Sequence, residues 1–351
     1  MKHTHFVFLL LLLVLGSCSD DDDQGTSPQT IPTQSKITLM VSLNGLGDNG
    51  YNDKIARGVM TFANTHAIEM SLLYPSDISY AKYMVNNWIK TDGVRDSSIL
   101  IVNNSYESMI DVDALNQLGK GSKILVIEGQ GDFHSPHLYN LRICRYGASY
   151  LIGTMAQEFD ALVLMAMPDY AIIDEARNGF LAGYEKYKHE RVNSRTLYIA
   201  EDESGFANPE KAHHLMEEYV YDDFIFPLAG GSVSGVVHFL NNDYFALALM
   251  AGMDSEQSGE SPRVPFSMVV HIDKLLTDYL EAWKNGDEWQ HHAVFGLNEQ
   301  AVEIVMNERF GYDLNIWDDR CSLEKFENYH RLYVNEAKEL ESDYISNIFE
   351  R

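Results

Sequence analysis

Residues 36–63 are KITLMVSLNGLGDNGYNDKIARGVMTFA, an apolar run, a glycine-rich turn and an amphipathic stretch in succession. The apolar run 36–43 predicts a buried strand, and residues 53–63 predict a helix because their apolar side chains recur at helical spacing. The turn between them, residues 44–52, joins the end of a strand to the start of a helix. In doubly wound sheets, ligands bind at such turns, beyond the carboxyl ends of the strands. The stretch therefore indicates an α/β fold with a binding position at this turn.

The same alternation of apolar runs and amphipathic stretches continues along the chain. Short strands that alternate with helices are typical of parallel α/β layers. The predicted fold class is α/β, with two Rossmann-like lobes of parallel sheet joined by a hinge. Further strands are expected at 68–74, 98–102, 123–128, 161–165, 195–199 and 223–227, and further helices at 80–90, 106–118, 148–158, 172–187 and 210–219.

A chain of 351 residues is long enough for two domains. We expect an N-terminal lobe formed by residues 36–145 and part of 271–311, and a C-terminal lobe formed by residues 146–270. The last residues, 312–351, form an extension in which apolar side chains recur at helical spacing. This pattern predicts one or two helices packed on a lobe, and a docking surface for a membrane partner is the alternative interpretation.

The N-terminal residues indicate export. Lys2 precedes an unbroken apolar run, residues 6–15, which is too short to span a bilayer and is typical of a signal peptide. The run ends in Leu-Gly-Ser-Cys, and small residues before a cysteine are what a lipoprotein signal peptidase accepts. We interpret residues 1–17 as a lipoprotein signal peptide and Cys18 as the lipidated first residue of the mature protein. The alternative is a plain secretory signal with an incidental cysteine.

Residues 18–35 are predicted to be a flexible acidic tether. They contain the acidic run Asp20–Asp23 and then a stretch rich in Thr, Ser, Gln and Pro, which cannot bury apolar area. An acidic run directly after the lipidated cysteine also resembles the surface-export signal of some Gram-negative lipoproteins. We therefore expect an outer-membrane lipoprotein of the cell envelope, exposed at the surface, with a periplasm-facing anchor as the alternative.

The charge composition argues against a nucleic-acid-binding protein. Aspartate and glutamate total 52 against 26 lysines and arginines, a formal net charge of -26, so the surface repels nucleic acid. The cysteines of the folded part, Cys144 and Cys321, are far apart in sequence, and whether they pair stays open. His134 and His137 form an H-x-x-H, but Pro136 disfavours the helix that would align them. We expect no metal, no cofactor and no catalytic residue.

One motif supports an enzyme as an alternative. Residues 45–50 spell G-x-G-x-x-G between a strand and a helix, the context of a dinucleotide-binding turn. Asp48 argues against this interpretation, because it puts a negative charge where a pyrophosphate would bind. The acidic residue expected at the ribose is also misplaced, since Glu69 stands at the start of the second strand. An exported nicotinamide-dependent oxidoreductase is thus the alternative function.

Seven segments, in order, resemble motifs of the basic membrane protein family, the purine-nucleoside-receptor-like solute-binding lipoproteins of ABC importers. They span roughly residues 37–310. The resemblance implies a type I periplasmic-binding-protein architecture, in which two α/β lobes close on a ligand. The segments and the family motifs are Gly47–Asn52 with Arg57–Val59 (D-x-S-F-N…G), Gly147–Gly153 (G-A-Y-L-A-G), Asn178–Gly183 (G-F-x-A-G), Phe206–Ala212 (F-N-D-P-x-K), Phe226–Gly235 (aromatic-A-G-G-T-G-x-G), Gly252–Gln257 (G-V-D-x-D-Q) and Val269–Asp273 (V-x-K-x-x-D).

The resemblance implies a nucleoside ligand and assigns residues to it. A nucleoside offers a flat base with a hydrogen-bonding edge, and vicinal hydroxyls that carboxylates accept. By their positions in the motifs, Tyr51 and Phe206 are the candidate base sandwich and Asn52 reads the base edge. Asp254 stands where the family carboxylate meets the ribose.

Further positions complete the predicted site. Glu128 ends a strand where the family carries Asp, and Gly230-Gly231 let backbone amides approach the ligand without a Cβ in the way. His271 stands where the family keeps Lys, and it is a shorter and pH-dependent donor. These differences, together with Tyr51 in place of the family Phe, leave related ligands open: a modified nucleoside, a free base, a flavin or a sugar.

Structural roles for three of these residues also stay open: Asn52 as a helix cap, Phe206 as a core aromatic and Glu128 as a solvated strand end. The predicted function is a non-enzymatic receptor, anchored in the membrane by its lipid, that passes a small-molecule ligand to a membrane transporter. It is expected to be a monomer. Besides the oxidoreductase, a surface scaffold with an unused cleft is the remaining alternative.

Overall fold

The computed structural model describes residues 35–48, 50–131, 134–219, 223–242, 247–311 and 320–349. The chain divides into residues 1–32 and residues 33–351, and the architecture is that of the second unit. The predicted signal peptide, the lipidation at Cys18 and all but the last residue of the predicted tether lie outside the described residues. In the described ranges, no helix has the length and apolar character needed to cross a membrane.

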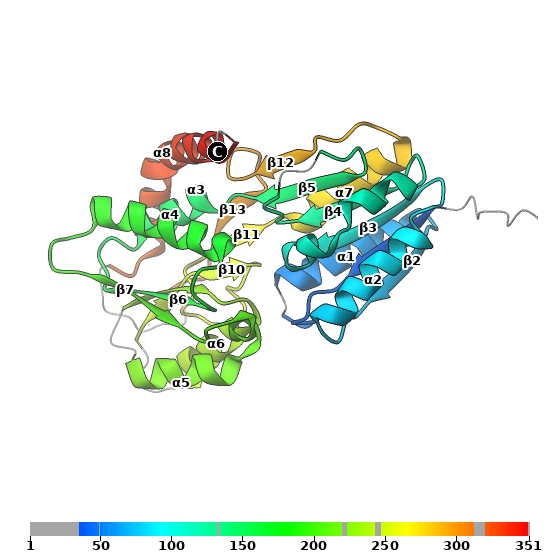
Figure 1. Ribbon diagram of the computed structural model, residues 1–351. Helices are drawn as coiled ribbons and strands as arrows, with labels where there is room; N and C mark the ends of the chain where they lie inside the picture. Colours follow the sequence, from blue (N-terminus) through cyan, green and yellow to red (C-terminus); the bar gives the residue numbers. More distant parts are fainter. Residues whose placement is uncertain are drawn as a thin grey trace, which may run out of the picture. The chain divides into compact units, whose positions relative to one another are not determined.

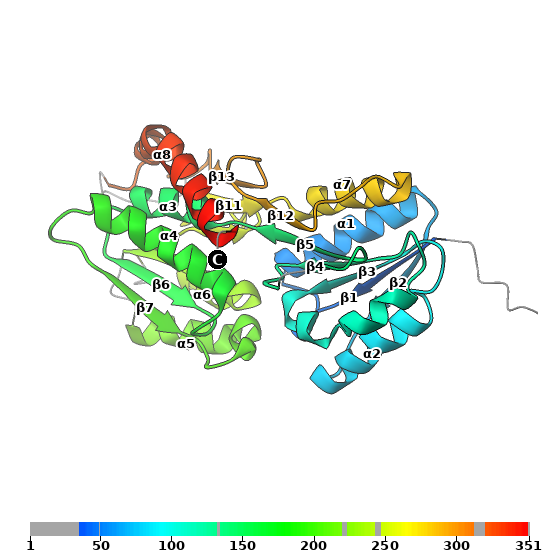
Figure 2. The same ribbon diagram turned by 45° about the horizontal axis from the view of Figure 1, so that its top comes forward.

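The first lobe is built on a six-stranded parallel sheet (Figure 1). The strands follow the order β12-β5-β4-β3-β1-β2, and each pairs in parallel with its neighbours. Helices α1 and α7 pack together on one face, and α2 covers the other (Figure 2). Burial on both faces explains why these strands are apolar runs. The elements are β1 Lys36–Met40, α1 Tyr51–Thr65, β2 Glu69–Leu73, α2 Ile78–Lys90, β3 Ser98–Asn103, β4 Lys123–Ile127, β5 Leu138–Ile143, α7 Ile272–Asn285 and β12 His292–Phe295.

The second lobe repeats the layered plan on a smaller sheet. Four parallel strands follow the order β7-β6-β8-β9. Helices α5 and α6 bury their apolar side chains against one face, and α3 and α4 cover the other. The elements are α3 Tyr146–Met155, β6 Ala161–Met165, α4 Ala171–Tyr187, β7 Ser194–Tyr198, α5 Pro209–Tyr219, β8 Phe224–Leu228, α6 Val233–Asn242 and β9 Leu249–Met250.

A third sheet lies where the lobes connect. It consists of β10 Gly252–Asp254 and β11 Phe266–Val270, which are parallel, and β13 Val302–Met306, which is antiparallel to β11. Strand β10 contacts β8 and strand β13 contacts α3, so this sheet packs with the second lobe.

The chain passes between the lobes three times. The first connection, residues 144–145, leads from β5 to α3. The second connection, residue 271, leads from β11 to α7, and the third, residues 296–301, leads from β12 to β13. Three separate connections allow the lobes to move relative to each other only by rotation about this region.

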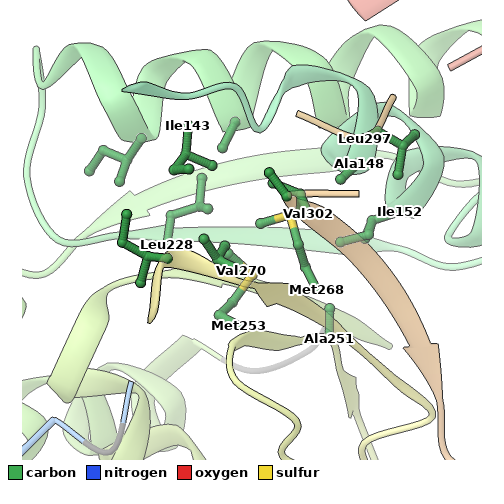
Figure 3. Close-up of a cluster of buried hydrophobic side chains, with 14 of the residues drawn as sticks. Ile143, Ala148, Ile152, Leu228, Ala251, Met253, Met268, Val270, Leu297 and Val302 are labelled. Atoms are coloured by element: carbon green, nitrogen blue, oxygen red, sulfur yellow. The ribbon is translucent and has the colours of Figure 1, made fainter. Parts of the chain in front are cut away.

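One hydrophobic cluster runs through the connections from lobe to lobe. Figure 3 shows Ile143 at the end of β5, Val270 of β11 and Val302 of β13 directed toward one another, with Met253 of β10 beside them. All of these side chains are buried. Because this apolar surface joins elements of both lobes, the base of the region between the lobes is a packed core.

Helices α3 and α4 approach closely because glycines of each face the backbone of the other. A Cβ on Gly153 would lie 2.1 Å from the carbonyl oxygen of Phe180, and a Cβ on Gly183 would lie 2.1 Å from that of Tyr150. No real Cβ tolerates such distances. These glycines belong to two segments of the family resemblance, so part of that resemblance reflects helix packing.

We expect Gly183→Ala to lower the free energy of unfolding by about 1–3 kcal/mol, because the methyl group forces two packed helices apart. Urea unfolding followed by tryptophan fluorescence measures the change. Gly259→Ala is the matched control, since a Cβ there meets no atom within 4 Å. If the two variants unfold at the same urea concentration, the close packing of α3 on α4 is not what requires glycine at this position.

The structure corrects one expected helix. Residues 106–118 do not form a continuous helix but two 3₁₀ segments, Asn104–Met109 and Val112–Gln117, with extended backbone at Ile110 and Asp111. Serine, aspartate and asparagine side chains in this stretch compete for backbone hydrogen bonds and disfavour an α-helix.

Strand β5 had no counterpart in the sequence prediction, and helix α8 lies in the C-terminal extension. Strand β5 falls between two expected elements, and its six residues are all buried. In its described part, the C-terminal extension forms one helix, α8 Leu323–Phe349, which packs against α3.

Candidate functional site

A cavity of about 340 Å³ lies between the lobes, and residues of both line it. This volume is within the usual range of small-molecule sites. Its wall includes the turns that follow β1, β4 and β8, so it lies at the carboxyl ends of the strands, where ligands of parallel sheets bind. Seven of the eight ligand-binding residues proposed from the sequence line it: Tyr51, Asn52, Glu128, Phe206, Gly230, Gly231 and Asp254.

His271 is the residue that the structure does not bring to the cavity wall. It forms the second connection, and its Nε2 lies 2.8 Å from Glu303 Oε1 on β13. The buried cation near this place is Lys54 of α1, whose Nζ donates to the carbonyl oxygens of Asp254 at 2.8 Å and Val270 at 2.9 Å. His271 is therefore not in a position to replace a ligand-binding lysine.

A buried charged network forms one side of the cavity. The Arg145 Nη1 donates to Glu128 Oε1 at 2.7 Å, and both residues are almost completely buried, with 5% and 3% of their surface exposed. The Tyr51 hydroxyl donates to the same oxygen at 2.8 Å, and the Ile143 amide donates to Oε2 at 3.1 Å. Glu128 is therefore an anchored carboxylate and not a solvated strand end.

The network shifts the pKa values of Arg145 and Tyr51. Burial alone would lower the pKa of Arg145, but Glu128, Tyr51 and Asp254 raise this pKa above its ordinary value. Burial and then the Glu128 carboxylate raise the pKa of Tyr51 well above its ordinary value, so this residue stays a phenol that donates its hydrogen bond. The Arg145 guanidinium lies 5.0 Å from the centre of the Tyr51 ring. One face of this ring is thus covered by a cation and is closed to a stacked base.

Asp254 is the carboxylate with the fewest partners in the cavity. Its Oδ1 lies 4.0 Å from Arg145 Nε, beyond hydrogen-bonding distance. Burial is the main reason that its pKa is raised; the Asp48 and Glu128 carboxylates raise it further, and Arg145 and Lys54 act against them. A carboxylate in this environment gains free energy from any ligand that donates hydrogen bonds to it.

The backbone is strained at two of the cavity carboxylates, Glu128 and Asp254. Glu128 has a φ of 61° and Asp254 a φ of 58°, in the left-handed region that residues other than glycine rarely adopt. Both residues lie at the ends of strands, where this conformation turns the side chain out of the sheet and toward the cavity. Such strain concentrates at ligand sites, because the surrounding structure must hold it.

Aromatic rings form the side of the cavity that belongs to the second lobe. Phe206 is half-buried and packs edge-on against Tyr170, with ring centroids 5.4 Å apart. Gly230 has a φ of +52°, and a Cβ on it would lie 3.2 Å from Phe206 Cδ1. Glycine is therefore required here both by the backbone conformation and by the close approach of the ring.

The lobes touch each other across the mouth of the cavity. Asn104 Nδ2 donates to the Tyr170 hydroxyl at 3.1 Å, and Ser105 Oγ donates to Glu203 Oε1 at 3.0 Å. The first residue of each pair comes from the first lobe and the second from the second lobe. These contacts join the two lobes beside the cavity.

Two polar atoms on the cavity wall have no protein partner among the described residues. Ser42 Oγ and Asn103 Oδ1 are buried and make no hydrogen bond there. Buried polar groups are usually satisfied, and those that are not call for an explanation. Ser42 follows β1 and Asn103 is the last residue of β3, so a polar ligand at the strand ends would satisfy them.

The glycine turn is not arranged as a dinucleotide site. Asp48 accepts hydrogen bonds from the backbone amides of Gly50 at 2.9 Å, Asn52 at 3.0 Å and Asp53 at 3.2 Å. Its carboxylate thus occupies the start of α1, where a pyrophosphate would have to bind. Asp48 therefore supplies the side-chain acceptor at the start of α1, whose N-cap residue is Gly50, and Asn52 lies on the cavity wall.

Comparison with known proteins places the fold but not the family. No protein-family model matches the sequence, and no curated protein matches it. The chain is similar to a solute-binding protein of an ABC transporter system from Aeropyrum pernix K1, with a TM-score of 0.67 and 14% identity over 90% of this chain and 92% of that one.

Two further solved structures share the fold. A periplasmic solute-binding protein of an ABC transporter from Actinobacillus succinogenes 130z, with bound D-allose, has a TM-score of 0.61 and 12% identity over 80% of this chain and 99% of that one. A transcriptional activator of the comK gene from Bacillus halodurans has a TM-score of 0.59 and 14% identity over 86% and 97%. At these identities the likeness shows the fold alone. The chain has the two-lobed α/β fold of type I periplasmic binding proteins, which confirms the fold class predicted from its sequence.

Proposed function

We propose that the protein is a non-enzymatic solute receptor that captures a small polar ligand between its lobes and delivers it to a membrane transporter. The observation that carries this proposal is the cavity between the lobes with two strained carboxylates, Glu128 and Asp254, at the ends of strands from different sheets. Ligand hydroxyls supply hydrogen-bond donors that the described residues do not give to the Asp254 carboxylate. The solute-binding proteins with the same fold support this function.

A nucleoside is the first candidate ligand. The Phe206 ring offers an apolar surface for a base, and Asp254 offers an acceptor for vicinal hydroxyls. Asn52, on the first turn of α1, is available to the edge of the base. Tyr51 contributes its ring edge and its hydrogen bond to Glu128, because Arg145 covers one of its faces.

A sugar is the second candidate. The carboxylates and the unpartnered Ser42 and Asn103 atoms suit a ligand with several hydroxyls. The D-allose bound to the protein from Actinobacillus succinogenes 130z supports this class. A sugar would use the same Asp254 acceptor and would not need the Phe206 ring to stack on a base.

The proposal includes a lipid anchor at Cys18 and a place in the cell envelope, as an outer-membrane lipoprotein. An anchored receptor keeps its ligand close to the membrane and therefore close to a transporter. The solute-binding proteins of similar fold support an envelope location. Labelling of the protein with a radioactive fatty acid, compared between the natural chain and Cys18→Ser, tests the anchor; equal labelling would contradict it.

A thermal-shift screen of the purified protein tests the ligand class. We expect a nucleoside to raise the melting temperature, because a ligand at about 100 times its dissociation constant adds about 2.7 kcal/mol to the native state. The screen contains nucleosides, free bases, sugars, flavins and nicotinamide cofactors. A shift for sugars alone would replace the nucleoside by a sugar. A shift for nicotinamide cofactors alone would favour the oxidoreductase, and no shift at all would favour the scaffold with an unused cleft.

A further inference from the structure

Glu341 of α8 is a wholly buried carboxylate outside the cavity, with 0% of its surface exposed. In the described part of the chain, no ion pair joins it to a basic side chain. An isolated buried carboxylate is costly unless hydrogen bonds compensate it. The residues that supply these bonds show what Glu341 holds together.

The two oxygens of Glu341 bind the start of α3, which follows the first connection, and the third connection. Oε2 accepts from the Gly147 amide, in the first turn of α3, at 3.0 Å. Oε1 accepts from the Leu297 amide at 2.6 Å, within the third connection. One carboxylate thus ties the third connection to the helix that the first connection enters.

The backbone at both contact points, Gly147 and Gly296, leaves room for this carboxylate. A Cβ on Gly147 would lie 2.8 Å from Glu341 Oε2, and a Cβ on Gly296 would lie 2.2 Å from Oε1. Helix α8 also holds the third connection through Asn298, whose Nδ2 donates to the Lys338 carbonyl oxygen at 3.1 Å and to Ser342 Oγ at 2.9 Å. The contact is therefore specific to this helix and these glycines.

The connections are linked to one another as well. The amide of Cys144 donates to the Phe295 carbonyl oxygen at 2.8 Å, and the amide of His271 donates to the Ala301 carbonyl oxygen at 2.9 Å. A change at the third connection is thereby passed to the other two. Glu341 binds the third connection, which is linked by these hydrogen bonds to the other two.

Opposing forces act on the ionisation of Glu341. Burial raises its pKa to about 7, the amides of Leu297 and Gly147 act against this, and the Glu299 carboxylate of the third connection raises it further. The other titratable groups beside it are the Cys144 thiol, whose pKa burial raises, and Tyr146 of α3, which stacks on Tyr344 of α8. Glu341 therefore changes its charge near neutral pH.

We propose that Glu341 is a proton-sensitive tie between the start of α3 and the third connection, and that its ionisation loosens the hinge of the receptor. The buried site offers the charged carboxylate two amide donors but no basic side chain among the described residues. An opened hinge lets water reach the carboxylate and stabilise its charge, so the ionised group favours opening and the neutral group favours the closed contact. The inference rests on the proposed function only in that the three connections act as the hinge.

The proposal predicts two pH effects of the same sign. The folded-state pKa is raised above the ordinary value of 4.5, so the contribution of Glu341 to global stability is fully present below about 4.5 and is lost as pH rises through about 7. The local hinge follows the same rule, because any opening that admits water returns the pKa toward its ordinary value. A side chain that only fills space would produce neither effect.

Hydrogen exchange of the ligand-free full chain tests the tie. Exchange is measured by mass spectrometry at about pH 6 and about pH 8, with labelling times scaled for the intrinsic exchange rate. We expect peptides that cover residues 146–150 and 296–302 to be at least about threefold better protected at the lower pH. Peptides from β3, far from the hinge, serve as an internal reference.

Glu341→Gln removes the titration and keeps the shape of the side chain. Its neutral amide does not titrate, so we expect the protection of the hinge to be the same at both pH values. Glu339→Gln, at an exposed position of the same helix, should behave as the natural protein. If Glu341→Gln does not fold, the pH comparison on the natural chain still decides.

Two results would overturn the proposal: equal hinge protection of the natural protein at both pH values, or an unchanged pH dependence in Glu341→Gln. Because no ligand is present, neither result depends on what the cavity binds. A failed ligand screen and a failed hinge experiment are therefore separate outcomes.

Discussion

Arg145→Met is expected to lower the free energy of unfolding by about 3–5 kcal/mol at neutral pH, because it breaks a buried ion pair from one side. The guanidinium is the only partner of opposite charge that the described structure gives to Glu128, at 2.7 Å. Methionine keeps most of the apolar contacts and removes the charge. Glu128 keeps its bonds from Tyr51 and Ile143, so the loss should fall toward the lower end of the range. Urea unfolding measures it.

The pH dependence of this loss distinguishes an electrostatic cause from a packing defect. Arg145 lowers the pKa of Asp254, so its removal raises a pKa that burial has already raised. The ionised form of Asp254 then costs stability at neutral pH, and the cost disappears as the group is protonated at lower pH. The deficit of Arg145→Met should therefore shrink on acidification.

Arg57→Met is the matched control for Arg145→Met. Arg57 lies on the exposed side of α1, with 60% of its side chain exposed and its Nη2 3.7 Å from Asp273 Oδ2. Exposed pairs of this kind contribute about 0–1 kcal/mol. Equal losses in the two arginine variants, or a pH-independent loss in Arg145→Met, would contradict the role assigned to the buried network.

The layered fold is predictable because the apolar pattern depends on local sequence. Residues 36–63 contain a strand, a turn and a helix with apolar side chains at the spacing of each element, and the structure forms β1 and α1 there. The pattern fails where buried residues are polar. In β5, Asn140 and Arg142 are buried beside apolar residues, and their partners Gly129 and Glu175 are remote in sequence. The alternation of polar and apolar residues in β5 is typical of a half-exposed strand, and it does not predict that all six residues are buried.

The candidate site was predictable as a set of turns but not as a set of interactions. The rule that ligands bind at strand ends, and the family resemblance, placed seven residues on one cavity wall. Arg145 and Lys54 were missed because their roles depend on long-range contacts: Lys54 donates to the carbonyl oxygen of a residue 200 positions away. The left-handed backbone at Glu128 and Asp254 also has no signature in residue type.

His271 shows the limit of transferring a motif position. Its place in the V-x-K-x-x-D segment suggested a donor to the ligand, yet its side chain pairs with Glu303 of β13. A buried lysine on another element, Lys54, lies beside the backbone of Asp254 instead. The motif identified the segment, and the packing of α1 against the third sheet determined which side chain is near the cavity.

Asp254→Asn is expected to separate binding from stability. Burial and the neighbouring carboxylates raise the pKa of Asp254, so its contribution to stability is fully present below its unfolded pKa and is lost as pH rises through the raised folded value. A neutral asparagine avoids this loss at neutral pH, and asparagine tolerates the left-handed φ of 58° well. We therefore expect an unchanged or higher melting temperature for the unliganded variant.

Ligand binding should weaken in the same variant. A hydrogen bond to a charged acceptor contributes about 1.5–3 kcal/mol, and the asparagine amide group turns one acceptor into a donor, so the affinity for the ligand found in the screen should fall about 10- to 100-fold. Calorimetric titration measures the affinity, and Glu256→Gln, an exposed neighbour, is the control. A variant that binds normally would remove Asp254 from the site, and one that melts lower would show that its carboxylate supports the fold. A residue that costs stability and is kept at a strained backbone position is best explained by the ligand that it binds.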